Sequence, residues 1–129
     1  MNSFIESEIL ELKEKYTDSI AKEIVSFLNA NGGTLLIGVK DDGVVVGVEK
    51  IDETLRKVSD IITSQIEPNP QDEITSELRF VNGKTIIALE INKGSKNIYC
   101  QKKYGFSSAG CTIRIGTSCK EMTPGQIKI

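Results

Sequence analysis

The sequence predicts an α+β domain in which a mixed sheet of about six to seven strands is covered by two main helices. Two segments carry apolar residues at helical spacing, and several short segments alternate apolar and polar residues as strands do. These segments interleave without a strict strand–helix–strand repeat, which favours a mixed sheet over a parallel one. With 129 residues, 39% of them apolar and 26% charged, the chain has the composition of a single globular domain over 1–129.

Two helices are expected, over about 18–30 and about 52–66. Their apolar stripes are formed by Ile20, Ile24, Phe27 and Leu28 in the first segment and by Leu55, Val58, Ile62 and Ile66 in the second. Hydroxyl and carboxyl side chains just before Ile20 can cap the first helix, and the glycine pair after Asn31 ends it. Pro68 prevents the second helix from continuing.

Seven strands are expected, two pairs of them joined as hairpins. They are 8–14, 34–39, 44–48, 74–81, 85–91, 97–101 and 112–116. Asp42-Gly43 and Asn82-Gly83 are two-residue turn signals, so 34–39 should pair with 44–48 and 74–81 with 85–91. The segment 102–110, with two glycines and two serines, is expected to be a loop.

The composition excludes several classes of function. The chain has no histidine, which removes Ser-His-Asp and Cys-His catalysis and histidine-ligated zinc. The spacing of its three cysteines matches no zinc or redox motif. No apolar run approaches the roughly 18 residues that a membrane span needs. The N-terminus lacks the pattern of a secretory signal, so no membrane partner and a cytoplasmic location are expected.

Charge is divided unevenly along the chain. Residues 1–92 hold 9 Lys/Arg against 17 Asp/Glu, whereas residues 93–129 hold 7 against one, a net charge of +6. Such a segment favours a basic face that attracts polyanions, although a solvated surface that offsets acids elsewhere is the alternative. The candidate nucleic-acid contacts are Lys102, Lys103, Tyr104, Arg114 and Lys120. Arg114 should alternate outward from Ile113 and Ile115 to reach a phosphate, or else form a salt bridge.

Two further groups of residues are candidates for chemistry. Gly32 and Gly33 can let backbone N–H groups approach a phosphate, or they can be a helix C-cap and nothing more. Glu6, Glu11 and Asp41 can converge if their strands are neighbours, and such carboxylates can hold Mg²⁺ or Mn²⁺ for phosphodiester cleavage, with Lys13 stabilising charge. The alternative is that these carboxylates are solvent-facing.

Four stretches together resemble one known family. They are Glu6-x4-Glu11-Leu12-Lys13, Phe27-Leu28-Asn29-Ala30-Asn31-Gly32-Gly33-Thr34-Leu35-Leu36-Ile37-Gly38-Val39, Asp41-Asp42-Gly43-Val44-Val45-Val46-Gly47-Val48 and Thr112-Ile113-Arg114-Ile115-Gly116-Thr117-Ser118. The chain is similar, over about 6–124, to the Alba-like domain of Schlafen proteins, found also at the N-terminus of bacterial and archaeal regulators of transcription.

The resemblance implies a DNA-binding domain at the start of a longer transcriptional regulator. It also implies two alternatives: a metal-dependent endoribonuclease whose acidic residues would be Glu6, Glu11 and Asp41, and a module that binds ATP. Only the nuclease would need Mg²⁺ or Mn²⁺. Lys40 stands where the family usually has an Asp, and the zinc-binding cluster of the animal members is missing, so the resemblance favours binding over cleavage. Because Alba-like domains commonly pair, a homodimer is a further expectation.

Overall fold

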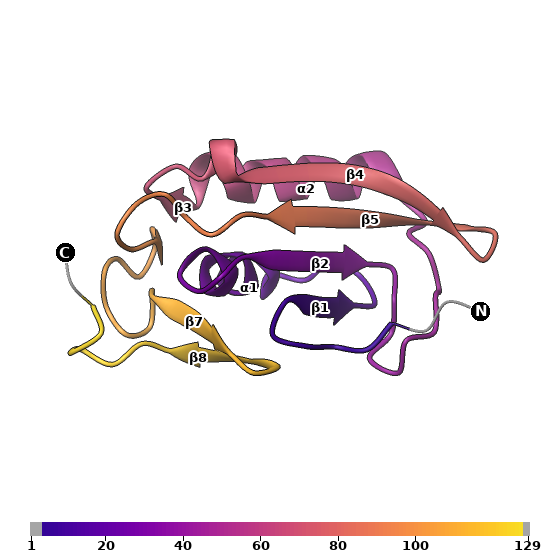
Figure 1. Cartoon of the computed structure of the whole chain (residues 1–129). Coiled ribbons are helices and arrows are strands. Elements are labelled where there is room, and N and C mark those ends of the chain that lie inside the picture. Colours follow the sequence, from indigo (N-terminus) through magenta and orange to yellow (C-terminus); the bar gives the residue numbers. More distant parts are fainter. Residues whose placement is uncertain (1–3, 128–129) are drawn as a thin grey trace.

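A four-stranded mixed sheet forms the centre of the molecule. The computed structural model describes residues 4–127. The sheet has the order β1 (Leu10–Lys13), β2 (Gly33–Ile37), β5 (Lys84–Ile91) and β4 (Ile74–Val81) (Figure 1). Strand β1 pairs with β2 in parallel, and the other pairs are antiparallel.

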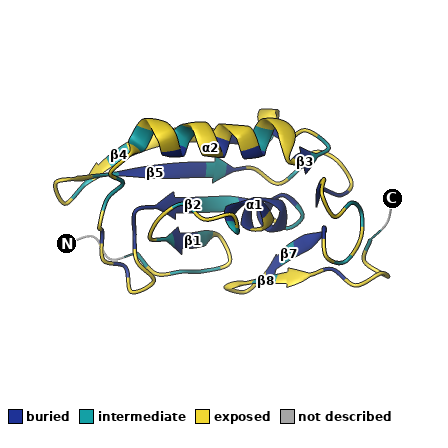
Figure 2. Cartoon of the chain, turned by 180° about the vertical axis from the view of Figure 1, so that it is seen from behind, coloured by how far each residue is buried: buried dark blue, intermediate teal, exposed yellow. Residues whose placement is uncertain are grey.

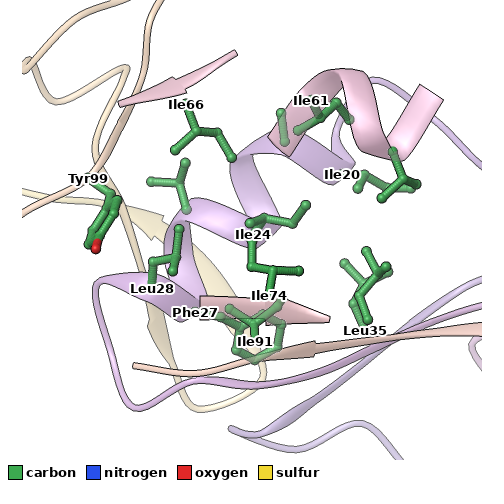
Figure 3. Close-up of a cluster of buried hydrophobic side chains, with 14 of the residues drawn as sticks. Ile20, Ile24, Phe27, Leu28, Leu35, Ile61, Ile66, Ile74, Ile91 and Tyr99 are labelled. Carbon is green, nitrogen blue, oxygen red and sulfur yellow. The ribbon is translucent and has the colours of Figure 1, made fainter. Parts of the chain in front are cut away.

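Both helices cover the same face of this sheet. In Figure 1 both helices lie behind the sheet, with α1 (Ile20–Leu28) behind β2 and α2 (Ile51–Ser64) behind β4 and β5. Figure 3 shows the core between these elements, in which Ile24 and Phe27 of α1 meet Leu35 of β2 and Ile91 of β5. The stripe predicted in α1 therefore lies in the main core, because apolar positions at this spacing share one helix face. The stripe predicted in α2 holds only in part: Leu55 and Ile62 are partly buried, and Ile66 reaches the core from β3 instead of from the helix.

A second apolar layer covers the opposite face of the sheet. Leu12, Leu36, Ile86 and Ala88 point to this side and pack against Val39 and Val45 of the segment that follows β2. The two central strands are thus buried on both faces, as Figure 2 shows for β5. This double burial explains why their sequences are almost continuously apolar.

The remaining strands form two small sheets, which corrects the expectation of one sheet with six to seven strands. Strand β3 (Ile66–Glu67) pairs with β6 (Cys100–Gln101), and β7 (Thr112–Ile115) pairs with β8 (Ser118–Glu121). The short 3₁₀ helix η1 (Gln71–Glu73) precedes β4. The β7–β8 hairpin packs against α1 instead of extending the central sheet. A prediction from local alternation cannot separate these sheets, because alternation gives no partner.

One predicted hairpin is confirmed and the other is reduced to a single bridge. Strands β4 and β5 meet at Asn82 and Gly83, both of which have positive φ, as a two-residue turn requires. The predicted pairing of 34–39 with 44–48 forms only next to its turn, where Val39 and Val45 make an isolated bridge. There the N–H of Lys40 donates to Val44 O and the N–H of Val46 donates to Gly38 O. The two sides of β2 are already occupied by β1 and β5, so the following residues fold across the sheet face instead.

The other boundaries differ modestly from those predicted. The segment 8–14 contains β1, 97–101 shortens to β6, 112–116 shortens to β7, and β8 was not predicted. Helix α1 begins at Ile20, two residues later than expected, and Ser19 at its N-cap makes no side-chain capping hydrogen bond. Within residues 4–127, no helix is both long enough and apolar enough to span a membrane.

Candidate functional site

A buried network of four charged side chains joins β1, α1 and β7. Arg114 Nη1 lies 2.5 Å from Glu11 Oε1 and 3.5 Å from Glu23 Oε1. Lys13 Nζ lies 3.6 Å from Glu11 Oε2 and 3.4 Å from Glu23 Oε2. The Arg114 side chain is only 1% exposed and the two glutamates are each 9% exposed. Two cations and two carboxylates therefore neutralise one another, with Arg114 and both glutamates buried and Lys13, 21% exposed, at the edge of the network.

The expectation that Arg114 points outward is wrong. On β7, Thr112 and Arg114 face α1, and the guanidinium carbon of Arg114 lies 4.9 Å from the centre of the Phe27 ring. Its Nη2 donates hydrogen bonds to Ser7 O (2.8 Å) and Leu10 O (3.1 Å). The salt bridge left open as an alternative is the arrangement observed, because the carboxylates of β1 and α1 converge on this side of β7.

Glu6 lies beside this network and has its own structural contact. Its Oε2 accepts a hydrogen bond from the N–H of Leu12 (3.1 Å). Burial raises the pKa of Glu6 above its usual value, and the nearby negative charges of Glu11 and Asp41 raise it further, while the Leu12 hydrogen bond opposes the shift. Strand β1 pairs with β2 in parallel, and Glu6 lies near enough to Glu11 and Asp41 for their charges to act on it.

These carboxylates do not form a set of metal ligands. Within residues 4–127, no three Asp, Glu or Cys side chains lie close enough together to hold one metal ion. Glu11 already faces Arg114 with one oxygen and Lys13 with the other, Glu6 accepts from the backbone of β1, and Asp41 is exposed in the turn after β2. Hence the chain's residues do not fit the predicted Mg²⁺ or Mn²⁺ site.

The glycine pair after α1 is also occupied by the chain itself. A Cβ at Gly32 would lie 2.5 Å from Ile91 O, and one at Gly33 would lie 2.5 Å from the Phe27 ring. Gly32 has φ +76°, and its N–H donates to Phe27 O at the end of α1. The C-cap interpretation is therefore the one observed, because the Gly32 N–H is bonded within the chain and a side chain at either glycine would clash with it.

A cavity of about 440 Å³ opens at the N-terminus of α1 and contains part of the predicted cationic segment. Lys103 and Tyr104 line it, together with Lys22 and Ser19 of α1's first turn. Tyr104 is half exposed, and Lys103 Nζ lies 5.0 Å from the centre of its ring. Ser19 makes no side-chain capping bond to the first N–H groups of α1, and the positive end of the α1 dipole faces the cavity, which Asp18 also lines.

The cationic residues do not form the single patch that was expected. Lys102 lines a neighbouring cavity of about 320 Å³ beside the end of α2, together with Lys103. Lys120 is directly opposite Ile113 in the β7–β8 ladder, whereas Glu121 is opposite Thr112, so Lys120 and Glu121 face opposite sides of β8. The structure thus keeps Lys102, Lys103 and Tyr104 together and separates them from Lys120.

Two features of this region were not predicted from the sequence. Lys22 belongs to the cavity although it lies in the acidic part of the chain; its place in the first helical turn was the available signal. A second cavity of about 500 Å³, which shares Ser19 with the first, is lined by Lys13, Lys15 and Lys40. Acidic side chains accompany the lysines in both cavities, namely Glu14, Asp41 and Asp42 in the larger and Asp18 and Glu121 in the smaller.

The chain belongs to the Schlafen, AlbA_2 family, whose model matches residues 6–123. This match confirms the resemblance drawn from the glycine-rich core and the closing strand. No curated protein matches the chain.

Two solved structures share the fold. The DIP2311 protein of Corynebacterium diphtheriae is 19% identical with a TM-score of 0.66, and the match covers 89% of this chain and 22% of that one. The chain therefore spans about a fifth of that protein's length. The N-terminal domain of a RecG-related protein of Nitrosomonas europaea, named after an ATP-dependent DNA helicase, is 23% identical with a TM-score of 0.60. That match covers 89% of this chain and 82% of the other. Both show similarity of fold.

Proposed function

We propose that this domain binds nucleic acid, with DNA as its ligand, and that it serves as the N-terminal part of a longer transcriptional regulator. The contacts are made at the cavity beside the N-terminus of α1 and at the neighbouring cavity that Lys102 lines. Lys22, Lys102 and Lys103 contact phosphates, and the Tyr104 ring stacks on an exposed base. Family membership supports this proposal, and the helicase-related name of one structural neighbour makes duplex DNA the first ligand to test.

The observation that carries the proposal is the combination of lysines, an uncapped helix N-terminus and an exposed aromatic ring around one cavity. Within the described residues, no carboxylate lies within salt-bridge distance of Lys22, Lys102 or Lys103. These ammonium groups are therefore free to exchange water for phosphate oxygens. The α1 dipole adds to their attraction for an anion, because its positive end points the same way.

The acids around the same cavities limit the strength of this binding. Asp18 and Glu121 lie at the cavity and repel phosphates at short range. We therefore expect modest affinity, low sequence discrimination and a fall in affinity with salt whose logarithmic slope corresponds to about 2–3 phosphates. Contacts to phosphates alone carry little information about base sequence.

The structure favours binding over the two alternatives drawn from the resemblance. RNA cleavage would need Glu11 as a metal ligand, whereas Arg114 and Lys13 engage both of its oxygens. ATP binding at Gly32 and Gly33 would need free backbone N–H groups at this turn, whereas the Gly32 N–H already donates to Phe27 O. We therefore do not propose a metal ion or a nucleotide as a cofactor.

Fluorescence anisotropy with labelled duplex DNA, single-stranded DNA and structured RNA at about 50 mM salt tests the proposal. We expect binding to the duplex, with Lys22→Ala and Lys103→Ala each weakening it and lowering the salt slope by about 1. Lys84→Ala is the matched control. It removes one exposed lysine at the β4–β5 turn, at the opposite end of the sheet from the segment that leads into β7 (Figure 1).

Absence of binding to all three probes would overturn the proposal. Equal weakening by Lys84→Ala and Lys103→Ala would show a general attraction to the chain instead of a site. Tighter binding to RNA than to duplex DNA would contradict the choice of ligand while leaving the cavity as the site. Circular dichroism should show that all variants keep the wild-type fold.

A further inference from the structure

The outer edge of β4 is an unpaired strand edge that carries large apolar side chains. Strand β4 is eight residues long and is the last strand of the central sheet. Within residues 4–127, no strand pairs with its outer side. Leu78 is 52% exposed and Phe80 is 76% exposed, and both point to the helix-covered face of the sheet, beyond the end of α2. An open edge with apolar side chains is a template for pairing with another strand.

The backbone groups available at this edge follow from the turn at Asn82 and Gly83. In a two-residue hairpin the residues flanking the turn form a hydrogen-bonded pair, and such pairs alternate along the ladder. Val81 faces Lys84 across this turn, so the even-numbered residues of β4 direct their N–H and C=O groups outward. Ser76, Leu78 and Phe80 therefore present the groups that a further strand would bind.

The sequence of β4 is complementary to itself in one antiparallel register. If Leu78 lies opposite Leu78 of a second copy, Ser76 lies opposite Phe80 and Glu77 lies opposite Arg79 in both directions. A shift of two residues one way places Glu77 opposite Glu77, and a shift the other way places Arg79 opposite Arg79. Like charges directly opposite each other destabilise a strand pair, so the charges select the first register.

The apolar groups match in the same register. A cavity of about 370 Å³ lies between α2 and β4, lined by Leu55, Val58, Ile62, Ile74 and Ser76 among others. Because Phe80 of the second copy lies opposite Ser76 on the helix-covered face, its ring reaches this cavity. Two such contacts form, one for each copy, since the arrangement is two-fold symmetric.

We propose that the edge of β4 is a homodimer interface in which two copies pair antiparallel about Leu78 and form one continuous eight-stranded sheet. This interface is separate from the cavity at the N-terminus of α1, and the proposal does not depend on the proposed function. Glu77 and Arg79, which bond to each other within one chain, exchange those bonds for the equivalent ones between chains. The occupant is a second copy, since its β4 brings the complementary charges at the same spacing.

Sedimentation equilibrium at concentrations up to about 100 µM tests the interface. The wild-type chain should approach twice its 14.2 kDa mass as concentration rises. Leu78→Lys should abolish this rise, because two lysines would then lie opposite each other. Val44→Lys is the matched control, since Val44 is also 52% exposed but lies in the segment after β2. It should dimerise as the wild type does.

A charge exchange distinguishes this register from any other. Glu77→Arg alone should weaken dimerisation at least about tenfold, because it places like charges opposite each other twice. Adding Arg79→Glu should restore dimerisation, because each pair is then opposite in sign again. Both positions are partly exposed, so folding should survive, which circular dichroism checks. A wild-type chain that stays monomeric, or a dimer that survives Leu78→Lys, would overturn the proposal.

Discussion

The two outer strands of the central sheet differ in whether the backbone groups on their outer edges are hydrogen-bonded. At β1, the N–H and the C=O of Leu10 bond with the backbone of Ser7, the same C=O also accepts from Arg114, and the N–H of Leu12 donates to Glu6. At β4, nothing in the described chain occupies the corresponding groups. The comparison teaches that Glu6 and Glu11, which look catalytic in the sequence, help to close a strand edge. Glu6 accepts from the Leu12 N–H, and Glu11 holds the Arg114 side chain that donates to Leu10 O.

The same contrast appears in two arginines that each contact two glutamates. Arg114 lies between Glu11 and Glu23 with its side chain 1% exposed. Arg79 lies between Glu77 and Glu90 with its side chain 37% exposed. Water screens the second group and is excluded from the first, so the two should differ widely in their contribution to stability.

The largest expected effect comes from replacing these arginines in turn. Arg114→Met should lower the free energy of unfolding by about 3–5 kcal/mol, because it leaves Glu11 and Glu23 buried with only Lys13 as a partner. Arg79→Met should cost less than about 1 kcal/mol, because its partners can be solvated. Urea unfolding followed by circular dichroism measures both.

Glu11→Gln extends this test if the Arg114 variant is too unstable to purify. It keeps the shape and a hydrogen-bond acceptor while removing one charge, so its cost should fall between those of the two arginine variants. Equal losses of unfolding free energy in Arg114→Met and Arg79→Met would contradict the contrast between the buried and the exposed arginine.

Amide hydrogen exchange at the two edges should show a smaller difference in the same direction. In dilute protein, the Leu10 and Leu12 amides should exchange at least about tenfold more slowly than the Leu78 and Phe80 amides, because only the former have acceptors within the chain. Nuclear magnetic resonance measures each amide separately. Glu6→Ala should accelerate Leu12 and leave Leu10 unchanged, and acceleration of both would mean that Glu6 supports the whole edge.

The pH dependence of stability should reveal the environment of Glu6, with the smallest effect of the three. Its pKa is raised in the folded chain above its ordinary value, first by burial and then by the charges of Glu11 and Asp41. The folded chain therefore holds this proton at pH values where the unfolded chain has lost it. Glu6 lowers the stability as pH rises through the window that starts near 4.5.

Glu6→Gln removes this titration, so the variant should gain stability relative to the wild type as pH rises from about 4 to about 7. Unfolding in urea at several pH values measures the difference. If the wild type instead gains stability relative to Glu6→Gln as pH rises, the hydrogen bond from Leu12 outweighs burial and charge repulsion in setting the pKa of Glu6.

Much of the architecture could be predicted because it follows from local patterns. The apolar stripe that includes Ile24 and Phe27 indicates a helix and its buried face, and Asn82-Gly83 indicates a hairpin turn. The hairpin predicted at Asp42-Gly43 forms only next to its turn and does not extend along β2, because β5, about fifty residues later, occupies the side of β2 that the hairpin needed. Local turn chemistry cannot account for a competing strand that is distant in the sequence.

The candidate site was predicted less well, since its charges are arranged by contacts between distant segments. Alternation along β7 correctly separates Arg114 from Ile113, but it does not say which side is buried. That side is buried because α1 packs on it and supplies Glu23, while β1 supplies Glu11. Lys22 lines the cavity at the N-terminus of α1 together with Lys103, because packing brings these distant segments together. The composition of the segment around Lys22 is acidic and gives no sign of this.

By itself the sequence determined the helices, the central strands, the family and the presence of a cationic segment near Tyr104, because each of these is encoded by residues close together in the chain. Only the tertiary structure decided which charges are neutralised and which strand edge stays open. Glu11 and Arg114 are 103 residues apart, and packing alone brings them into a space that water does not enter. Whether an ionised side chain binds a ligand or supports the fold is set by that exclusion of water.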